Sequence, residues 1–405
     1  MTLKGKHILV GICGGIAAYK IPELIRQFRK AGAEVQVTTT KNALEFVTSL
    51  TLQTVSGYKV YSDVFATINE HSTEHISLPD WADVMLIAPA TANVLCKMAN
   101  GIADDALTTT FAAMRKPVVI APAMNTNMYE SPATQQAIHQ LAQWDNITML
   151  DAASGELACG TSGKGRMQEI EVLLAATQYA LTPKTLVGKN ILITAGPTQE
   201  SIDPVRYITN ASTGKMGYAI ARSCLRRGAN VMLITGPCQT SINDYKAFAP
   251  LCIIPVESAA DMCEATLQAF DKADISILSA AVADFTPIIA ASQKIKKQPG
   301  QTSMTIEMTM TTDIAATLGK FKRADQKLIG FALETHDEMQ NAQKKLQSKN
   351  LDMIVLNSLQ DTGAGFGTDT NKVTFLYPNG QIKNLPLISK EEVADEIIDS
   401  LLEIN

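Results

Sequence analysis

Short runs of consecutive hydrophobic residues alternate along this chain with segments of helical periodicity. Runs without a polar residue at every second position are typical of strands that are buried on both faces of a parallel sheet. The amphipathic segments between them have the length of crossover helices, as in 16–30. The pattern therefore predicts an α/β fold. The strand-bearing segments are 6–15, 34–38, 84–89, 118–122, 189–197, 231–236, 275–280, 328–332 and 353–357.

Two of these segments open in the same way. Residues 6–15 and 189–197 each begin with a basic residue, continue as a β-branched run and end in a glycine turn, which is the opening of a nucleotide-type α/β unit. A short linker-like stretch near 181–189 separates a helix from the second opening. The sequence predicts two Rossmann-like three-layer domains, at residues 1–188 and 189–405.

Composition and charge narrow the class of protein. Hydrophobic residues make up 46% and charged residues 19%, as in ordinary globular proteins, and the net charge of −5 gives no reason to expect nucleic-acid binding. No apolar run approaches the roughly 20 residues that span a bilayer, and the N-terminus lacks a signal-peptide pattern. The seven scattered cysteines are interpreted as reduced thiols. We expect a cytoplasmic protein with small-molecule partners and no membrane contact.

Three glycine-rich segments raise the question of phosphate binding. The turn Gly14-Gly15-Ile16 lies between a strand and a helix and could present backbone N–H groups to a phosphate, although a ligand-free tight turn is an equal alternative. It lacks the third glycine of the dinucleotide fingerprint. Segments 160–166 and 212–217 resemble P-loops, but neither has Ser or Thr after its lysine. Neither segment is therefore predicted to be a P-loop.

Polar residues follow two neighbouring strands of the first predicted sheet. Segments 89–93 and 121–129 both come after buried strands, and ligands of open parallel sheets bind at the carboxyl ends of strands. His75 and the glycine-rich segment 158–167, which carries Cys159, add a histidine and a thiol. Either residue alone is more often structural. Together with the two strand ends they indicate a site.

These four segments make the first 180 or so residues similar to the flavin-containing cysteine decarboxylases. The matching segments are His75, 89–94, 122–128 and 158–167, with Thr91 and Val94 departing mildly from the family pattern. The resemblance implies a flavodoxin-like flavoprotein domain. It implies FMN bound by Gly14, Gly15, Ile16, Thr40, Phe46, Thr91 and Asn93, and substrate bound by Arg166 and Met167.

The resemblance also implies a separate role for the flavin and for each catalytic residue in the decarboxylation. Loss of CO₂ from a cysteine derivative needs an electron sink, which the flavin supplies by taking electrons from the thiol side and later returning them. In this scheme His75 assists the oxidation, Asn125 holds the departing carboxylate and Cys159 donates a proton in the reduction. A thiol suits that last role because its pKa can be tuned towards neutrality.

The second half resembles the phosphopantothenate–cysteine ligase domain. The matching segments are 195–206, 208–217, 280–285, 294–297, 330–335 and 366–371. The resemblance implies activation of a carboxylate by CTP, with Lys294 and Mg²⁺ near Asp284 offsetting the triphosphate charge and Asn210 holding the acyl-cytidylate. It implies further CTP contacts from Ala280, Asp313, Phe331, Lys345 and Lys349, and substrate contacts from Asp203, Arg206 and Ser212.

Taken together, the two resemblances imply two consecutive steps of coenzyme A biosynthesis that end in 4′-phosphopantetheine. They also imply a homo-oligomer, with trimeric flavin domains whose sites lie between subunits and dimeric ligase domains, in an assembly as large as a dodecamer. Two alternatives stay open. One is a regulatory binding protein, which an acidic tail would favour, although none is visible. The other is an NAD(P) oxidoreductase, for which no complete dinucleotide fingerprint is present.

Overall fold

The structure, a computed structural model, divides into two compact units. It describes residues 3–65, 73–156, 160, 162–297, 299, 302–334, 336–358, 363, 365 and 367–403. The first unit comprises Met1–Pro183 and Asn243–Phe248, and the second comprises Lys184–Ile242 and Ala249–Asn405. Within the first unit, the ring of Phe248 lies 5.4 Å from that of Tyr179, so the segment 243–248 packs on the last helix of that unit. The candidate proton donor Cys159 lies outside the described residues.

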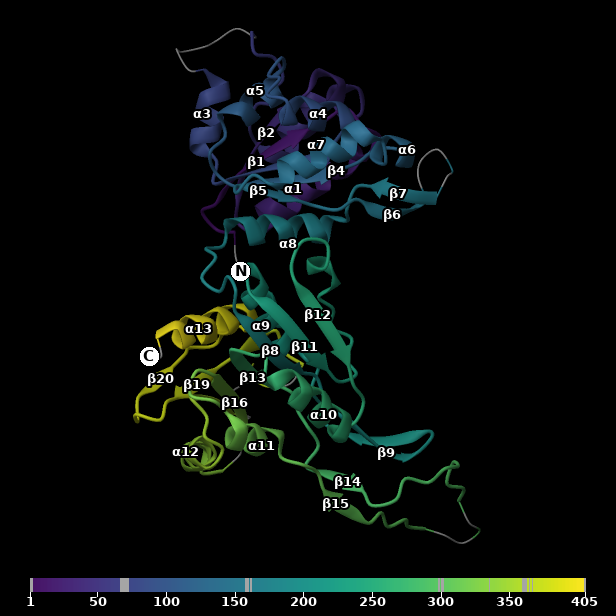
Figure 1. The fold of residues 1–405 in the computed structure, drawn as a ribbon, viewed down its shortest axis with the longest axis vertical. Helices are drawn as coiled ribbons and strands as arrows, with labels where there is room; N and C mark the ends of the chain where they lie inside the picture. Colours follow the sequence, from purple (N-terminus) through teal and green to yellow (C-terminus); the bar gives the residue numbers. More distant parts are fainter. Residues whose placement is uncertain are drawn as a thin grey trace. The chain divides into compact units, whose positions relative to one another are not determined.

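The first unit is built on a five-stranded parallel sheet with the order β2-β1-β3-β4-β5. Figure 1 labels β1, β2, β4 and β5 of this sheet. Its strands are β1 (His7–Ile12), β2 (Glu34–Thr39), β3 (Val84–Ala90), β4 (Val118–Pro122) and β5 (Ile147–Met149). Its α-helices are α1 (Ile21–Lys30), α2 (Ser49–Ser56), α3 (Glu74–Trp81), α4 (Ala92–Ala99), α5 (Ala106–Ala113), α6 (Thr126–Tyr129), α7 (Pro132–Ala142) and α8 (Ile170–Leu181). The short strands β6 (Ala153–Glu156) and β7 (Ser162–Arg166) form a separate hairpin. The predicted α/β class is confirmed.

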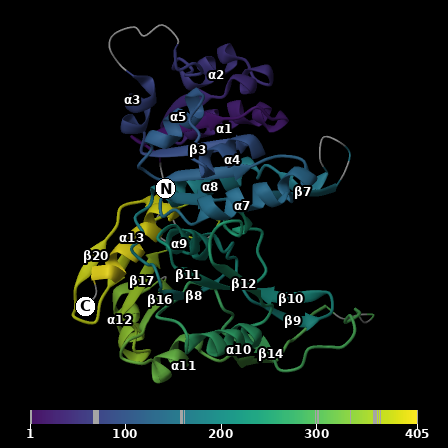
Figure 2. The ribbon, with the colours of Figure 1, turned by 45° about the horizontal axis from the view of Figure 1, so that its top comes forward.

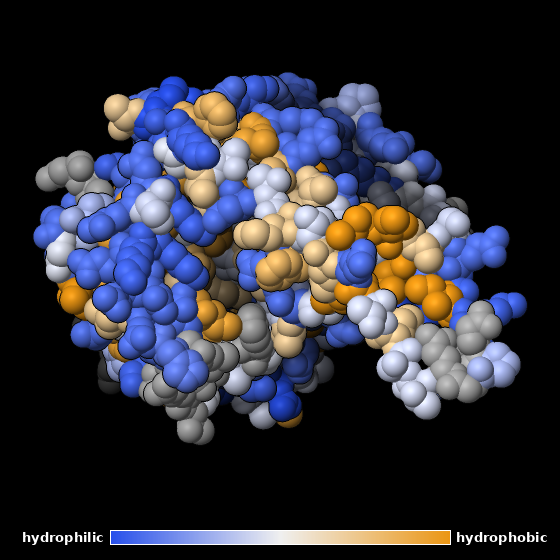
Figure 3. Space-filling model, turned by 90° about the horizontal axis from the view of Figure 1, so that it is seen from below, coloured by the Kyte–Doolittle hydropathy of each residue, from blue (hydrophilic) through white to orange (hydrophobic). Residues whose placement is uncertain are grey.

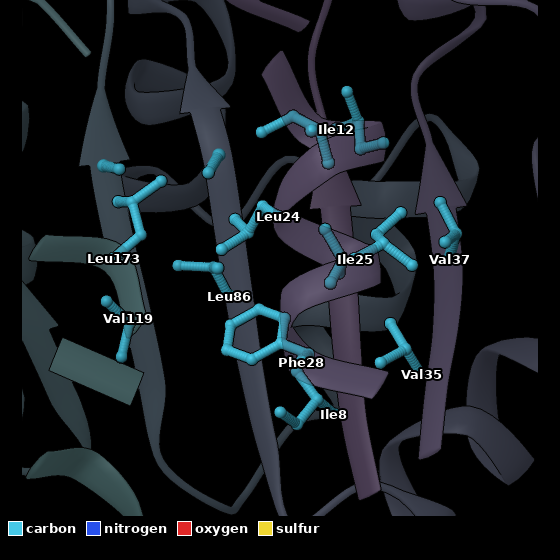
Figure 4. Close-up of a cluster of buried hydrophobic side chains, with 14 of the residues drawn as sticks. Ile8, Ile12, Leu24, Ile25, Phe28, Val35, Val37, Leu86, Val119 and Leu173 are labelled. Atoms are coloured by element: carbon cyan, nitrogen blue, oxygen red, sulfur yellow. The ribbon is translucent and has the colours of Figure 1, made fainter. Parts of the chain in front are cut away.

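Hydrophobic side chains cover both faces of this sheet. On one face, Ile8, Val35 and Leu86 pack against Ile25 and Phe28 of α1, as the close-up shows (Figure 4). Residues that alternate with these along the strands point to the other face, where they pack against α3, α4, α5 and α7. Burial on both faces explains why the strand sequences are continuous hydrophobic runs rather than alternating ones.

The segment 16–30, which the sequence predicts as one helix, forms two. Residues Ile16–Lys20 form a 3-10 turn, and α1 begins only at Ile21. Pro22 lies in the first turn of α1, where its missing N–H costs nothing. An α-helix running through from Ile16 would lose one hydrogen bond there and place the proline ring against the preceding turn.

The second unit is built on an eight-stranded sheet with the order β12-β11-β8-β13-β16-β17-β19-β20. Its strands are β8 (Asn190–Ala195), β11 (Asn230–Thr235), β12 (Leu251–Pro255), β13 (Ile275–Leu278), β16 (Lys327–Glu334), β17 (Met353–Ser358), β19 (Val373–Leu376) and β20 (Ile382–Asn384). The last two pair antiparallel and were not predicted. Helices α10 (Ala259–Phe270), α11 (Ile314–Phe321) and α12 (Glu338–Ser348) share one core cluster, while α9 (Lys215–Arg226) packs on β8 and β11 and against α13 (Lys390–Glu403).

Two two-stranded ribbons extend from the second unit beyond the carboxyl ends of its strands. One pairs β9 (Gln199–Asp203) with β10 (Arg206–Thr209), and the other pairs β14 (Phe285–Pro287) with β15 (Met308–Met310). Strand β14 packs beside β9, and both views show the two ribbons at the same edge of the unit (Figures 1 and 2). A third short pair joins β18 (Thr370–Asn371) to β21 (Ile388–Ser389).

Candidate functional sites

The carboxyl ends of the strands in the first unit surround a cavity of about 710 Å³. Main-chain hydrogen bonds draw these ends together: Cys13 N donates to Pro89 O over 3.3 Å, and Ala123 N donates to Ala90 O over 2.9 Å. A third, from Met124 N to Gly165 O over 2.9 Å, attaches the β6–β7 hairpin to the end of β4. The cavity therefore has walls from three strand ends and one hairpin.

Backbone geometry at Gly14 leaves no room for a side chain. A Cβ atom there would lie 2.6 Å from the Cβ of Asn42, so only glycine lets the turn after β1 approach the turn after β2. The neighbouring Gly15 has extended backbone angles and lines the cavity together with Ile16. The turn thus offers bare main chain to whatever occupies the cavity.

Several hydroxyl groups near these strand ends are buried without a hydrogen-bond partner. Thr40, which directly follows β2, is 8% exposed, and its Oγ1 accepts and donates no hydrogen bond within the described chain. The hydroxyls of Thr38, Thr39 and Tyr61 are in the same state. An unpaired buried hydroxyl costs about 1–3 kcal/mol. A polar ligand such as FMN would offer partners to such hydroxyls, although none of these four residues lines the cavity itself.

The structure brings together some of the predicted residues of the first site and not others. Gly14, Gly15, Ile16, Thr91, Asn125, Arg166 and Met167 line the cavity. Thr40, Phe46, Asn93 and the half-buried His75, which lies in α3, do not line it. Lys20 lines it without having been predicted, because its segment was interpreted simply as helix. Lys20 Nζ and Arg166 NH2 each lie 3.0 Å from an oxygen of Glu169.

In the second unit, Asn210 lies at the point where the strand order reverses. The chain leaves β8 for β11 on one side and later returns to β13 on the other, so a crevice opens beyond the ends of β8 and β13. The side-chain amide of Asn210 donates to Ala281 O over 3.0 Å and to Val282 O over 3.1 Å. Ala280 N donates to Thr194 Oγ1 over 3.3 Å. Asn210 and Ala280, predicted for one site, therefore lie at the same crevice.

A second group of predicted residues gathers where α11 begins and α12 ends. Lys349 Nζ lies 2.7 Å from Asp313 Oδ2, and Lys345 Nζ lies 2.7 Å from Glu334 Oε1. Burial alone would raise the pKa of Asp313, but the hydrogen bonds from Lys349 and the Ala316 N–H, with Lys345 nearby, hold it below its usual value. Glu334 was not predicted, although it lies in the same matching segment as the half-buried Phe331.

The predicted metal residue, Asp284, is exposed after β13. Within the described residues, no group of three or more His, Cys, Asp or Glu side chains is arranged to hold a metal ion. Magnesium commonly binds through one or two carboxylates and the phosphates of a substrate, so a single carboxylate fits this ion when a nucleotide is present.

Ser212 lines another cavity, of about 870 Å³, at the start of α9. Two lysines that were not predicted line it as well. Lys215 Nζ donates to Gly367 O (3.0 Å) and Asp369 Oδ1 (2.6 Å), and the buried Lys390 Nζ donates to Gly365 O (3.0 Å) and Thr368 O (2.6 Å). The sequence pattern does not predict these contacts, because each lysine binds a loop that is distant from it in the sequence.

The two sheets, each with a ligand-sized cavity or crevice at the carboxyl ends of its strands, define a protein with two α/β ligand-binding units in one chain. Residues 1–182 match the family described as Flavoprotein, and residues 186–404 match the DNA/pantothenate metabolism flavoprotein C-terminal domain. The chain belongs to the family of coenzyme A biosynthesis bifunctional proteins. This membership confirms the resemblance and the enzymatic character inferred from the sequence.

Relatives of known name match over nearly their full length. The coenzyme A biosynthesis bifunctional protein CoaBC of Bacillus subtilis (strain 168) is 48% identical over 402 residues, covering 98% of this chain and 97% of that protein. The protein of the same name from Vibrio vulnificus (strain YJ016) is 44% identical over 402 residues, covering 99% and 98%. The solved C-terminal domain of a CoaBC protein is 42% identical and covers 55% of this chain and 100% of that one, with a TM-score of 0.45.

In the part of the chain that is described, no helix is both long and apolar enough to cross a membrane.

Proposed function

We propose that this chain catalyses two consecutive steps of coenzyme A biosynthesis. The second unit would join 4′-phosphopantothenate to cysteine at the expense of CTP, and the first would decarboxylate the product to 4′-phosphopantetheine. The observation that carries the proposal is that each unit has residues of its matching family segments at the carboxyl ends of its strands. The chain also matches a bifunctional relative over 98% of its length.

In the first unit we propose that FMN binds at the cavity. Its phosphate would lie on the Gly14-Gly15-Ile16 turn, which lines the cavity with bare main chain. Thr40, which does not line the cavity, would contribute its unpartnered hydroxyl to the same ligand. When bound, FMN would supply a reversible two-electron sink for the decarboxylation. Asn125, which faces the cavity from the start of α6, would hold the carboxylate that leaves as CO₂. Cys159 would donate the final proton.

His75 lines no part of this cavity within one chain. We propose that the flavin site is completed between subunits of a trimer, so that the His75 of one chain would serve a neighbouring one. Thr91 and Asn93, at the start of α4, would complete the flavin contacts, and Phe46, which is exposed after β2, would lie against the same ligand. Arg166 and Met167 would bind the substrate from the β6–β7 hairpin.

In the second unit we propose activation of the acid by CTP. The carboxylate of 4′-phosphopantothenate would attack the α-phosphorus, form an acyl-cytidylate and release pyrophosphate; the amine of cysteine would then form the amide and release CMP. Lys294 and Mg²⁺ at Asp284 would offset the charge of the phosphates, and Asn210 would hold the acyl-cytidylate. The cluster of Asp313, Lys345 and Lys349, with Phe331 and Ala280, would contact the nucleotide.

We also propose that the chain is a homo-oligomer. The ribbons of the second unit carry large apolar side chains that are exposed to solvent. The view from below shows hydrophobic residues, in orange, gathered on the part of the surface that projects to the right (Figure 3). The exposed residues are Val205, Tyr207, Phe285, Ile288, Ile289, Met308 and Met310. Contiguous exposed apolar surface of this kind is typical of an interface. The mass in solution tests this proposal, and a monomer would reject it.

Turnover with the three substrates and Mg²⁺ tests the function. The purified chain should release one CO₂ and one pyrophosphate for each 4′-phosphopantetheine formed. Supplying preformed 4′-phosphopantothenoylcysteine should give CO₂ without CTP, and absence of CO₂ in that assay would reject the decarboxylase half alone. Absence of pyrophosphate from the complete mixture would reject the ligase half. A flavin absorbance spectrum tests the cofactor independently of turnover.

A further inference from the structure

The carboxylate of Asp203 is fully buried at the turn of the β9–β10 ribbon. Its Oδ1 accepts from Val205 N over 2.9 Å and from Arg206 N over 3.0 Å. Its Oδ2 accepts from Arg206 Nε over 3.0 Å and from Ile295 N over 3.1 Å, and it also contacts Arg206 NH2. A carboxylate has about four acceptor sites. Those of Asp203 are all used within the chain, which leaves none for a substrate.

Both backbone groups of Ile295 form hydrogen bonds with the ribbon. Its N–H donates to Asp203, and its carbonyl accepts from Arg206 NH2 over 2.8 Å. Ala291 N donates to Ile202 O over 2.9 Å, so the ribbon holds the loop at a second point four residues earlier. Lys294 lies between these two points. The ion pair of Asp203 and Arg206 thus fixes the main chain beside the lysine that the ligase reaction would use.

The opposite end of the same ribbon carries Asn210. Thr209 Oγ1 donates to Thr198 O over 2.7 Å, and Asn210 donates to Ala281 O and Val282 O at the crevice. The Lys294 loop and Asn210 are therefore attached to the two ends of one short ribbon. Its length sets the separation between the cation that would face the phosphates and the amide that would hold the acyl-cytidylate.

We infer that Asp203 is a positioning residue for Lys294 and makes no contact with substrate. The loop carries three lysines within four positions, Lys294, Lys296 and Lys297, whose mutual repulsion favours an extended chain. Asp203 supplies a buried negative charge that accepts from the loop main chain. Hydrogen bonds from Arg206 hold the pKa of Asp203 well below its usual range, which favours the charged carboxylate that accepts these bonds. The inference rests on the proposed function only for the role of Lys294.

Limited proteolysis of the full chain tests the holding of the loop without any assay of activity. Trypsin cleaves after lysine, so cleavage after Lys294, Lys296 and Lys297, followed by mass spectrometry, reports how often the loop leaves the ribbon. Asp203→Asn should speed this cleavage about tenfold, the factor that corresponds to about 1.4 kcal/mol. Asp325→Asn removes an exposed Asp–Arg pair elsewhere in the same unit and should leave the rate unchanged.

Ligase kinetics test whether Asp203 acts through Lys294. Asp203→Asn should slow pyrophosphate release in the wild-type background but have almost no further effect when Lys294→Gln is present, because the two residues act as one unit. Equal effects in both backgrounds, or lost activity with an unchanged cleavage rate, would overturn the inference. If Asp203→Asn fails to fold, the cleavage rate of Arg206→Gln, which removes the bond to the Ile295 carbonyl, gives the same comparison for the holding of the loop. Absence of ligase activity in the wild type would reject the proposed function, while the proteolysis would still decide the inference about the loop.

Discussion

The guanidinium of Arg226 lies 3.1 Å from Glu391 Oε2 and joins α9 to α13 in the second unit. Arg226 is 1% exposed, and its other nitrogen lies 3.0 Å from Asp395 Oδ1. Arg222 and Arg227 pair with the same two carboxylates, so the contact between the helices is a network rather than one ion pair. Helix α9 begins after the loop that carries Ser212, and α13 begins at Lys390, so the network holds together two helices that both begin at one cavity.

Replacement of Arg226 tests the contribution of this network to stability. We expect Arg226→Met to lower the free energy of unfolding of the second unit by about 2 kcal/mol. Removing one member of a fully buried pair costs about 3 to 5 kcal/mol, but here both carboxylates are partly exposed and keep another arginine. Denaturant titration measures the change. The matched variant Arg323→Met, which breaks an exposed pair with Asp325 and an exposed hydrogen bond to Asp271 O, should change stability by about 1 kcal/mol or less.

The same network predicts a dependence of stability on pH. Burial alone would raise the pKa of Glu391, but Arg222 and Arg226 lower it below its ordinary value of 4.5. A carboxyl whose pKa is lower in the folded than in the unfolded state stabilises the fold above the unfolded pKa and loses this contribution as the pH falls through the folded one. The wild type should therefore melt at a higher temperature than Glu391→Gln at pH 6, and the difference should shrink below about pH 4.5. A difference that is constant with pH would contradict this.

Two variants at the second site should separate the two chemical steps of the ligase. Lys294→Gln should lower the rate of pyrophosphate release by about 100-fold, the usual cost of removing one group that stabilises developing charge. Asn210→Asp should still release pyrophosphate in a first turnover but slow the use of the acyl-cytidylate, which then accumulates. Rapid-quench measurement of pyrophosphate and of the intermediate distinguishes them. Full turnover in both variants would show that these assignments are wrong.

Gly14 should control the binding of flavin. A Cβ at this position would lie 2.6 Å from the Cβ of Asn42 and 3.0 Å from its carbonyl carbon, so Gly14→Ala must displace the turn that would hold the phosphate. We expect bound flavin per chain to fall about tenfold or more, which corresponds to at least about 1.4 kcal/mol of binding free energy. Adding Asn42→Gly removes the nearest side-chain atom and should restore part of the binding. Absorbance of the purified protein measures both effects, and undiminished flavin in Gly14→Ala would contradict the prediction.

The sequence by itself determined the class of fold and the edges at which sites lie. Continuous hydrophobic runs such as 84–89 and 118–122 correspond to β3 and β4. A strand that is buried on both faces of a sheet needs a hydrophobic side chain at nearly every position, so its sequence is a continuous hydrophobic run. The polar residues that follow these runs, Thr91 and Asn125, line one cavity because the ends of parallel strands share one edge of a sheet. The local sequence pattern is therefore enough to predict the strands and the edge of the sheet at which a site lies.

Only the tertiary structure decided which distant groups meet. Asp203 and Ile295 are 92 positions apart, and Arg226 and Glu391 are 165 apart, so no periodicity in either segment records the contact. The antiparallel addition of β19 and β20 and the exclusion of His75 from the cavity of its own chain likewise depend on how elements order themselves in space. Hydrophobic patterning reports whether a residue is buried. The partner of a buried charge depends instead on how distant helices and strands pack against one another, as α9 and α13 do around Arg226.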